Sequence, residues 1–133
     1  MFVSFVLVAH IVFGEGFKFY QRFAYYDKIL HFSNSIGIAI FVFIAGYALF
    51  FAARPKLNIG FAIITVFLCT VGIGALWEIG EYVGDVLFGF HSQGSPIDSP
   101  LIDTMKDLLY DMIGGALGAI ATAIFIQREK KQR

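Results

Sequence analysis

Polar and apolar residues occupy long, separate blocks along this chain. Apolar blocks run from Met1 to about Phe19, from about Ile29 to Ala53, from near Ile59 to Trp77 and from about Asp103 to Ile126. A helix needs roughly 20 apolar residues to cross the core of a bilayer. The pattern therefore predicts an all-α fold: a polytopic membrane helical bundle of about four transmembrane helices, in a single domain over residues 1–133.

The first block, Met1 to Phe19, departs furthest from a pure apolar span, because Ser4, His10, Glu15 and Lys18 interrupt it. Its length just suffices for a crossing, and a shallow or re-entrant helix is the alternative. The block lacks the basic start and the small-residue cleavage site of a secretory signal, and a further apolar block follows it. We therefore expect it to belong to the mature protein.

Helix-ending residues separate the blocks. The proline after Arg54 disfavours helical geometry at that arginine, so the second helix should end there. The third helix should continue through Asp85, and the segment from His91 to Pro100 is dense in turn residues. Asp103 and Thr104 can cap the free amides of a helix start, so the fourth helix is predicted to begin there.

Composition strengthens the membrane assignment. Of the 133 residues, 58% are hydrophobic and 15% are charged, and the mean hydropathy is +0.74, well above that of an ordinary soluble domain. The formal net charge is zero, so nothing in the overall balance indicates nucleic acid as a partner. Cys69 is the single cysteine, which excludes an intrachain disulfide, and its apolar neighbours in the sequence predict a buried, unreactive thiol.

Basic residues predict the orientation in the cell (inner) membrane. They gather in the C-terminal tail and at Arg54 and Lys56, whereas the segment from Trp77 to Asp111 contains only Lys106. The positive-inside rule therefore places the tail and the middle loop in the cytoplasm. With four spans, the N- and C-termini are then both cytoplasmic. Against this orientation stand the basic residues between the first two blocks, which it places outside: Lys18, Arg22 and Lys28.

Acidic residues are concentrated at one end of the predicted bundle. Most of the chain's 10 acidic residues lie between Trp77 and Asp111. In antiparallel spans this junction meets the turn between the first two blocks, which brings these ionisable residues to one membrane face: Glu15, Asp27, His31, Glu78, Glu81, Asp85, Asp103, Asp107 and Asp111. Lys28, Lys106 and Arg22 could neutralise some of the carboxylates but are too few for all of them.

Helical spacing places these acids on shared faces. At about 100° per residue, the third predicted helix carries one stripe: Glu78, Glu81 and Asp85. The fourth carries a second stripe at four-residue intervals: Asp103, Asp107 and Asp111. Gly114 and Gly118 continue this second stripe. Small residues at this spacing let a neighbouring backbone approach closely, so the second stripe should face another helix rather than lipid.

Structural roles are the simpler explanation for part of the set. Asp103 can be a helix cap, Asp85 and Asp98 solvated residues, His10 and His91 structural histidines, and Trp77 and Tyr82 interfacial anchors. The explanation is weaker for the residues at membrane depth, namely His31, Glu78, Glu81, Asp107 and Asp111. Ionisable side chains at that depth are costly, usually face the interior of a bundle, and are candidates for function.

Several carboxylates with one imidazole suit a divalent metal such as Mg²⁺, Mn²⁺ or Zn²⁺. Carboxylates so close together cannot all stay ionised without cations, and the lack of cysteine ligands excludes a thiolate zinc site. The predicted metal ligands are Asp27, His31, Glu81, Asp107 and Asp111. The predicted catalytic residues are Glu78, Glu81 and Asp107.

A metal at the membrane interface could polarise a phosphoryl or acyl oxygen of a lipid-linked or envelope substrate, or activate a water, with a glutamate as base. A metal-dependent membrane hydrolase or phosphotransferase is therefore one hypothesis. A cation or proton transporter, or a structural membrane subunit with a proton-sharing carboxylate network, is the alternative. A transport pathway should continue across the bilayer, whereas these acids gather on one side, which favours the enzyme-like interpretation.

The series Asp27-Lys28-x-x-His31-Phe32, then Glu78 and Glu81, then Asp103-Thr104-x-x-Asp107-x-x-x-Asp111-x-x-Gly114-Gly115-Ala116 resembles the VanZ-like membrane proteins and the related YjdF-like family. The resemblance covers roughly Tyr26 to Ala119 and implies a small helical membrane protein of prokaryotic type. VanZ is associated with glycopeptide resistance by an unestablished mechanism, so the resemblance supplies no reaction. Asp111, where VanZ-like chains often have asparagine, departs from that family, and the loop from His91 to Pro100 fits the YjdF-like branch better. These departures speak against a glycopeptide-related role.

Overall fold

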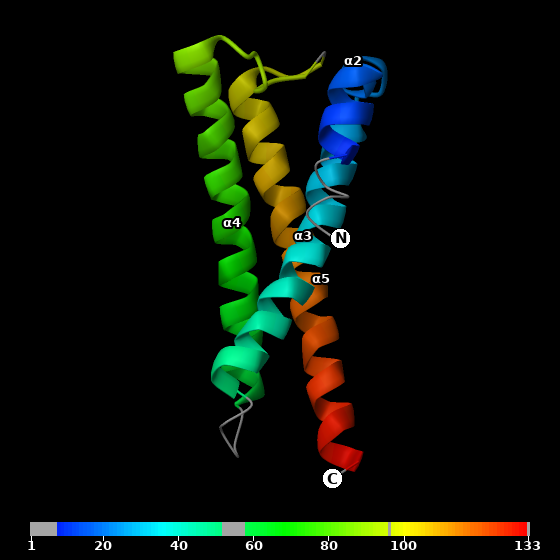
Figure 1. Ribbon diagram of the computed structural model, residues 1–133, viewed down its shortest axis with the longest axis vertical. Helices are drawn as coiled ribbons and strands as arrows, with labels where there is room; N and C mark the ends of the chain where they lie inside the picture. The colour runs from blue at the N-terminus through cyan, green and yellow to red at the C-terminus, as the bar shows by residue number, and fades with distance from the viewer. Residues whose placement is uncertain (1–7, 52–57, 96, 133) are drawn as a thin grey trace.

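The computed structural model describes residues 8–51, 58–95 and 97–132. Its elements are η1 (Val8–Gly16), α2 (Phe19–Arg22), α3 (Tyr26–Gly46), η2 (Tyr47–Phe51), α4 (Ile59–Phe88) and α5 (Pro100–Gln132), where η denotes a π-helix. Figure 1 shows α3, α4 and α5 as long rods that run the length of the bundle, with α2 at one end. The described residues form helices and no strand, which confirms the all-α prediction.

Three helices are long and apolar enough to cross a membrane: Tyr26–Leu49, Ile59–Phe88 and Pro100–Arg128. The predicted count of about four is not confirmed. In its described part, the first predicted span is the 9-residue helix η1, far short of the roughly 20 residues that a crossing needs. The rest of that predicted span includes residues 1–7, which lie outside the described residues.

The helix ends that carry the acidic residues meet at one end of the bundle, as chain order predicts. α3 and α5 begin at this end and α4 finishes there, at the top of Figure 1, where α2 also lies. The C-terminal end of α5 lies at the opposite end. We call the first of these the acidic end.

The helix boundaries follow from local capping chemistry. The side chain of Asn58 accepts a hydrogen bond from the Phe61 amide at 3.2 Å and caps α4. Gly89 terminates α4 with a φ of 69°, a conformation that glycine adopts without strain. The predicted start of α5 at Asp103 is wrong: the helix begins at Pro100, because proline suits the first turn of a helix. This leaves the Asp103 carboxylate available for longer-range bonds.

Glycine permits the close packing of α5 against α3. A Cβ atom added to Gly114 would lie 2.5 Å from the Phe32 carbonyl oxygen and 2.9 Å from the Ser35 Cβ. A Cβ atom on Gly118 would collide with the Cβ of Ala39. The backbones of α3 and α5 therefore touch along this stripe, which confirms that it faces a helix rather than lipid.

Beyond the acidic end, the interior of the bundle is apolar. Its buried core consists of Ala39, Phe43, Ala62, Val66, Ala119 and Ile126. Two buried threonines bond to their own helices: Thr70 Oγ1 donates to the Val66 carbonyl at 2.8 Å, and Thr122 Oγ1 to the Gly118 carbonyl at 3.0 Å. The prediction of a buried thiol is wrong, because Cys69 lies on the exposed face of α4.

Candidate functional site

Lys28 lies at the centre of the acidic end. Its ammonium donates to Asp103 Oδ1 at 2.5 Å, to Asp107 Oδ2 at 2.7 Å and to Asp27 Oδ2 at 3.2 Å. The residue is only 3% exposed, so these carboxylates are its compensating charges. The Asp103 carboxylate also accepts the Gly94 amide at 3.0 Å, which ties the loop before α5 to the same cluster.

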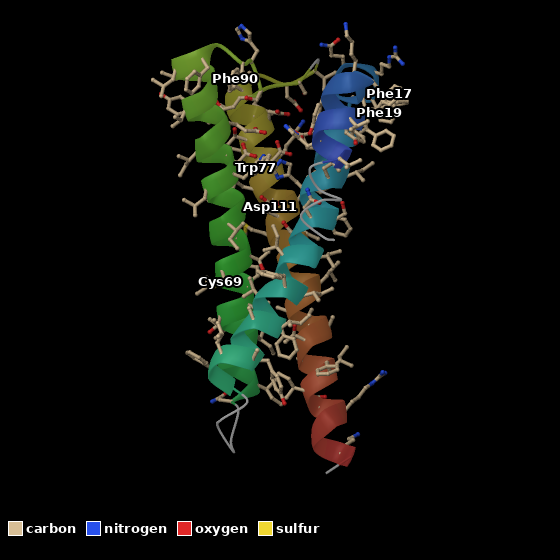
Figure 2. The ribbon with its side chains drawn as sticks, in the orientation of Figure 1. Phe17, Phe19, Cys69, Trp77, Phe90 and Asp111 are labelled. Carbon is tan, nitrogen blue, oxygen red and sulfur yellow. The ribbon has the colours of Figure 1, made fainter. Side chains whose placement is uncertain are left out.

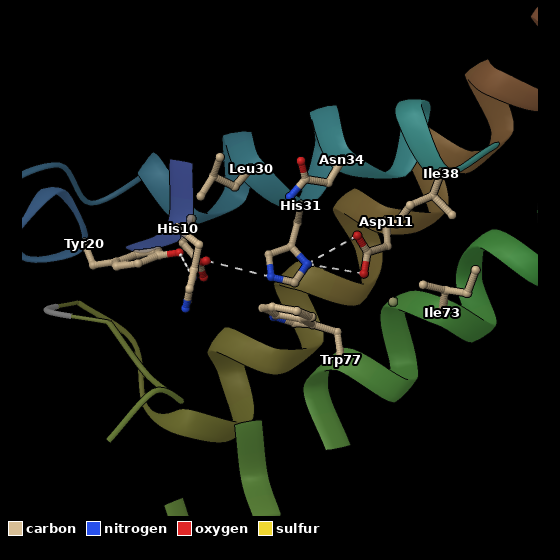
Figure 3. Close-up of a pocket in the computed structure, with 11 residues that line it drawn as sticks. His10, Tyr20, Leu30, His31, Asn34, Ile38, Ile73, Trp77 and Asp111 are labelled. Atoms are coloured by element: carbon tan, nitrogen blue, oxygen red, sulfur yellow. Dashed lines mark hydrogen bonds and ion pairs between the residues drawn. The ribbon is translucent and has the colours of Figure 1, made fainter. Parts of the chain in front are cut away.

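His31 lies one turn further into the bundle and joins all three long helices. Its Nδ1 is 3.3 Å from the Asp111 carboxylate of α5, and its Nε2 is 3.4 Å from Glu78 Oε1 of α4 and 3.8 Å from Asp27 Oδ1 of α3. Ser35 Oγ donates to Asp111 Oδ1 at 2.6 Å, which fixes the aspartate from the other side. Figure 3 shows Asp111 at one edge of the imidazole and Trp77 next to the ring.

Glycine makes room for this histidine–aspartate pair. A Cβ atom on Gly74 of α4 would collide with the carboxylate of Asp111. α4 can therefore approach α5 closely at this depth only because position 74 has no side chain. Figure 2 shows oxygen and nitrogen atoms gathered between the helices in the half of the bundle that contains Trp77 and Asp111.

Two buried carboxylate oxygens have no hydrogen-bond partner within the part of the chain that the structure describes. They are Glu78 Oε1 and Asp107 Oδ1, on residues that are 4% and 2% exposed. Leaving such an oxygen unpaired costs about 1–3 kcal/mol, and more when the group is charged. Glu78 Oε1 faces His31 Nε2 across 3.4 Å without hydrogen-bond geometry. A proton, a water or a cation could satisfy either oxygen, and a protonated His31 could also satisfy Glu78 Oε1.

Asp27, His31 and Asp107 form the group that could hold a metal ion. Each offers one ligand atom, and these atoms all lie within 4.8 Å of one another. Of the other predicted ligands, Asp111 lies on the far side of the imidazole, against Ser35. Glu81 lies apart from this group, where its Oε1 accepts the Trp77 indole N–H at 3.0 Å. The structure thus brings together only part of the predicted set.

The remaining acids near the cluster have structural partners. Asp85 accepts the Ser92 amide at 2.6 Å and the Gln93 amide at 2.9 Å, so it anchors the loop after α4. Asp98 pairs with Lys106 at 2.6 Å. This bond holds Lys106 away from the buried carboxylates, which leaves Lys28 as their ammonium among the described residues.

Two hollows near the acidic end share part of their lining, and His31 lines the first of them. The apolar hollow, of about 210 Å³, lies between α3 and α4 against Leu30, Ile38, Ile73 and Trp77. The polar hollow, of about 380 Å³, lies towards the acidic end and is lined in part by Lys18, Gln21, Glu81, His91 and Ser92. Both are bordered by His10, Tyr20 and Asp27.

Sequence reasoning assigned His10 and Trp77 to structural roles and missed their place beside the site. His10 Nδ1 lies 2.6 Å from the Tyr20 hydroxyl, and the His10 and Trp77 rings meet edge to face with centroids 5.7 Å apart. Trp77 is not simply an interfacial anchor, because it also lines the apolar hollow. In the sequence, the position of Trp77 directly before Glu78 could have indicated that it lies beside the site.

Comparison with known proteins identifies a family and a relative, but neither has a described function. A family described as "Predicted membrane protein (DUF2238)" matches residues 1–128. A Thermotoga maritima protein, named only "Uncharacterized protein", is 32% identical over 126 residues, which cover 93% of this chain and 59% of that relative. The chain thus spans less than two thirds of the relative's length. No solved structure matches the chain.

Proposed function

This chain belongs to the DUF2238 family of predicted membrane proteins, and we propose that it binds a divalent cation at Asp27, His31 and Asp107. One observation carries the proposal: the buried Oδ1 of Asp107 has no hydrogen-bond partner, although the Oδ2 of the same carboxylate is held by Lys28. An oxygen left free on a fixed carboxylate, beside an imidazole and a second carboxylate, is a ready metal ligand.

The chemistry of these donors favours Mg²⁺, Mn²⁺ or Zn²⁺, which accept carboxylate oxygens together with an imidazole nitrogen. Three protein ligands leave coordination positions for water or substrate, as in catalytic rather than structural sites. Lys28 limits the excess of negative charge without occupying all of the carboxylate oxygens. Lys28 would therefore bind Asp107 Oδ2 and the cation would bind Asp107 Oδ1.

The reaction we propose is hydrolysis or group transfer at a phosphoryl or acyl centre of a lipid-linked substrate. A cation at this position would polarise the substrate oxygen and acidify a bound water. Glu78 is the candidate base, since its free oxygen lies 3.4 Å from His31 Nε2 and can take a proton from that water. With its Nε2 towards the cation, His31 would direct its Nδ1 to Asp111, which would hold the imidazole ring in place.

Transport receives less support from this arrangement. Below the cluster, the buried residues are the apolar core, and the hydroxyls of Thr70 and Thr122 are bonded to their own helices. No polar path leads from the cluster to the opposite end among the described residues. A proton-sharing carboxylate network in a structural subunit is the second candidate, because protons would also satisfy the free oxygens of Glu78 and Asp107.

The membrane orientation belongs to the same proposal. We place the protein in the cell (inner) membrane with the basic C-terminal tail in the cytoplasm and the acidic end outside. An acidic end outside the cell would be accessible to an envelope substrate. The prediction that both termini are cytoplasmic depends on a first span, which η1 does not provide in its described residues.

Metal content tests the proposed site directly. We expect the detergent-purified protein, after incubation with Mg²⁺, Mn²⁺ or Zn²⁺ and removal of excess ion, to retain about one metal per chain by elemental mass spectrometry. Asp107→Asn should lose that metal, because an amide is a poorer ligand than a carboxylate. Asp98→Asn is the matched control and should keep it, since Asp98 pairs with Lys106 outside the cluster. Absence of metal from the wild type with all three ions would favour the proton-sharing network instead.

A further inference from the structure

The apolar hollow beside His31 and the polar hollow next to it form one path with a polar end and an apolar end. His10, Tyr20 and Asp27 border both hollows, so no helix separates them. Figure 3 shows the apolar hollow, which runs from the shared residues Tyr20 and His10 past His31 and Trp77 to Ile38 and Ile73. Such a path matches a ligand whose own chemistry changes from polar to apolar along its length.

The apolar end suits a hydrocarbon chain. It lies between α3 and α4, and its lining residues Ile73 and Trp77 are 41% and 43% exposed, so it opens sideways towards lipid. Its volume of about 210 Å³ is below the roughly 300–1,000 Å³ of a pocket that encloses a whole ligand. One segment of a hydrocarbon chain can therefore enter the apolar hollow while the rest of that hydrocarbon chain stays in the bilayer.

The polar end must supply the affinity. Moving a chain from lipid into a protein hollow gives no hydrophobic gain, because the lipid tails are equally apolar. The headgroup contacts therefore decide which lipid binds. The polar hollow is lined by Lys18 and by the imidazoles of His10 and His91, together with the carboxylates Asp27 and Glu81.

Charge in the polar hollow points to an anionic headgroup once a cation is in place. A phosphate that contacts both Lys18 and a cation on Asp27 would be held by two positive charges, and charge-assisted bonds of this kind are about twice as strong as neutral ones. We propose that the ligand is a lipid with a phosphate headgroup in the polar hollow and one hydrocarbon chain in the apolar hollow. This inference rests on the proposed metal site.

Trp77 provides a built-in reporter for the test. It is the only tryptophan in the chain and lines the apolar hollow. An alkyl phosphate with a brominated chain should therefore quench its fluorescence saturably when added to metal-loaded protein in detergent. The unbrominated alkyl phosphate should reverse the quenching by competition, whereas inorganic phosphate should not. An alkyl trimethylammonium of equal chain length should also fail to compete.

Variants separate the headgroup from the chain. Lys18→Gln should weaken binding of the brominated alkyl phosphate about tenfold, whereas Arg22→Gln, which removes an exposed cation outside the hollow, should not change it. Ile73→Phe should obstruct the apolar hollow and weaken binding, whereas Ile64→Phe on the exposed face of α4 should have no effect.

The outcomes distinguish this inference from the metal proposal. Saturable, metal-dependent quenching that is sensitive to Lys18→Gln and Ile73→Phe supports both. A protein that retains its metal but shows only unsaturable quenching, or that binds the trimethylammonium amphiphile equally well, overturns the lipid-phosphate inference and leaves the metal site standing. A protein that retains no metal under any of the three ions overturns the metal site and, with it, the headgroup contacts inferred here.

Discussion

Lys28→Met should destabilise the protein by roughly 3–5 kcal/mol, the cost of breaking a buried charge cluster by removing one partner. The ammonium is bonded to Asp27, Asp103 and Asp107, on residues that are largely withdrawn from solvent. Methionine has a similar length and keeps the packing, so the loss reports charge rather than volume. The measurement is the denaturant or thermal unfolding of the detergent-solubilised protein, followed by circular dichroism.

The matched control for this substitution is Lys106→Met. Lys106 pairs with Asp98 at 2.6 Å, but its side chain is 44% exposed, so the loss should be only about 0–1 kcal/mol. Adding Asp103→Asn to Lys28→Met should recover part of the stability by removing one of the stranded charges. Equal effects of the two lysine substitutions would show that Lys28 does not compensate the carboxylates.

The long helices could be predicted from the sequence because apolar block length and helix-ending residues act locally. Gly89 ends α4, in agreement with the block pattern, whereas the predicted helix end at Arg54 lies outside the described residues. The first block could not be assigned in the same way. Its described part is a short π-helix followed by a turn at Lys18, where φ is 58°. Whether this block crosses the membrane or forms a shallow or re-entrant helix stays a prediction, since residues 1–7 lie outside the described residues.

The convergence of acids could be predicted from chain order and helical spacing, but their pairing could not. Spacing places Glu78 and Glu81 on one broad face, yet one turns to His31 and the other to Trp77. Lys28 is adjacent to Asp27 in the sequence, and this position predicts a residue at the membrane interface. Its long side chain instead reaches α5, 75 and 79 positions further along the chain. The direction of such a flexible side chain depends on packing that no local pattern contains.

Glycine at position 114 is the second large effect that we expect. Gly114→Ala should destabilise the protein by about 1–3 kcal/mol, the usual cost of forcing extra atoms into a packed contact. The new Cβ would lie 2.5 Å from the Phe32 carbonyl oxygen. That oxygen belongs to the helix backbone and cannot move aside alone, so α3 and α5 must separate. The separation would also shift the bond between Ser35 and Asp111.

Gly72→Ala is the control, because a Cβ there meets nothing within 4 Å. Alanine is favoured over glycine within a helix by roughly 0.8–1.0 kcal/mol, so this variant should be as stable as the wild type or slightly more so. Unfolding of both variants in the same detergent gives the comparison. Equal stability of Gly114→Ala and Gly72→Ala would show that the backbones of α3 and α5 are not in contact. The arrangement of His31 and Asp111, which depends on that contact, would then be wrong as well.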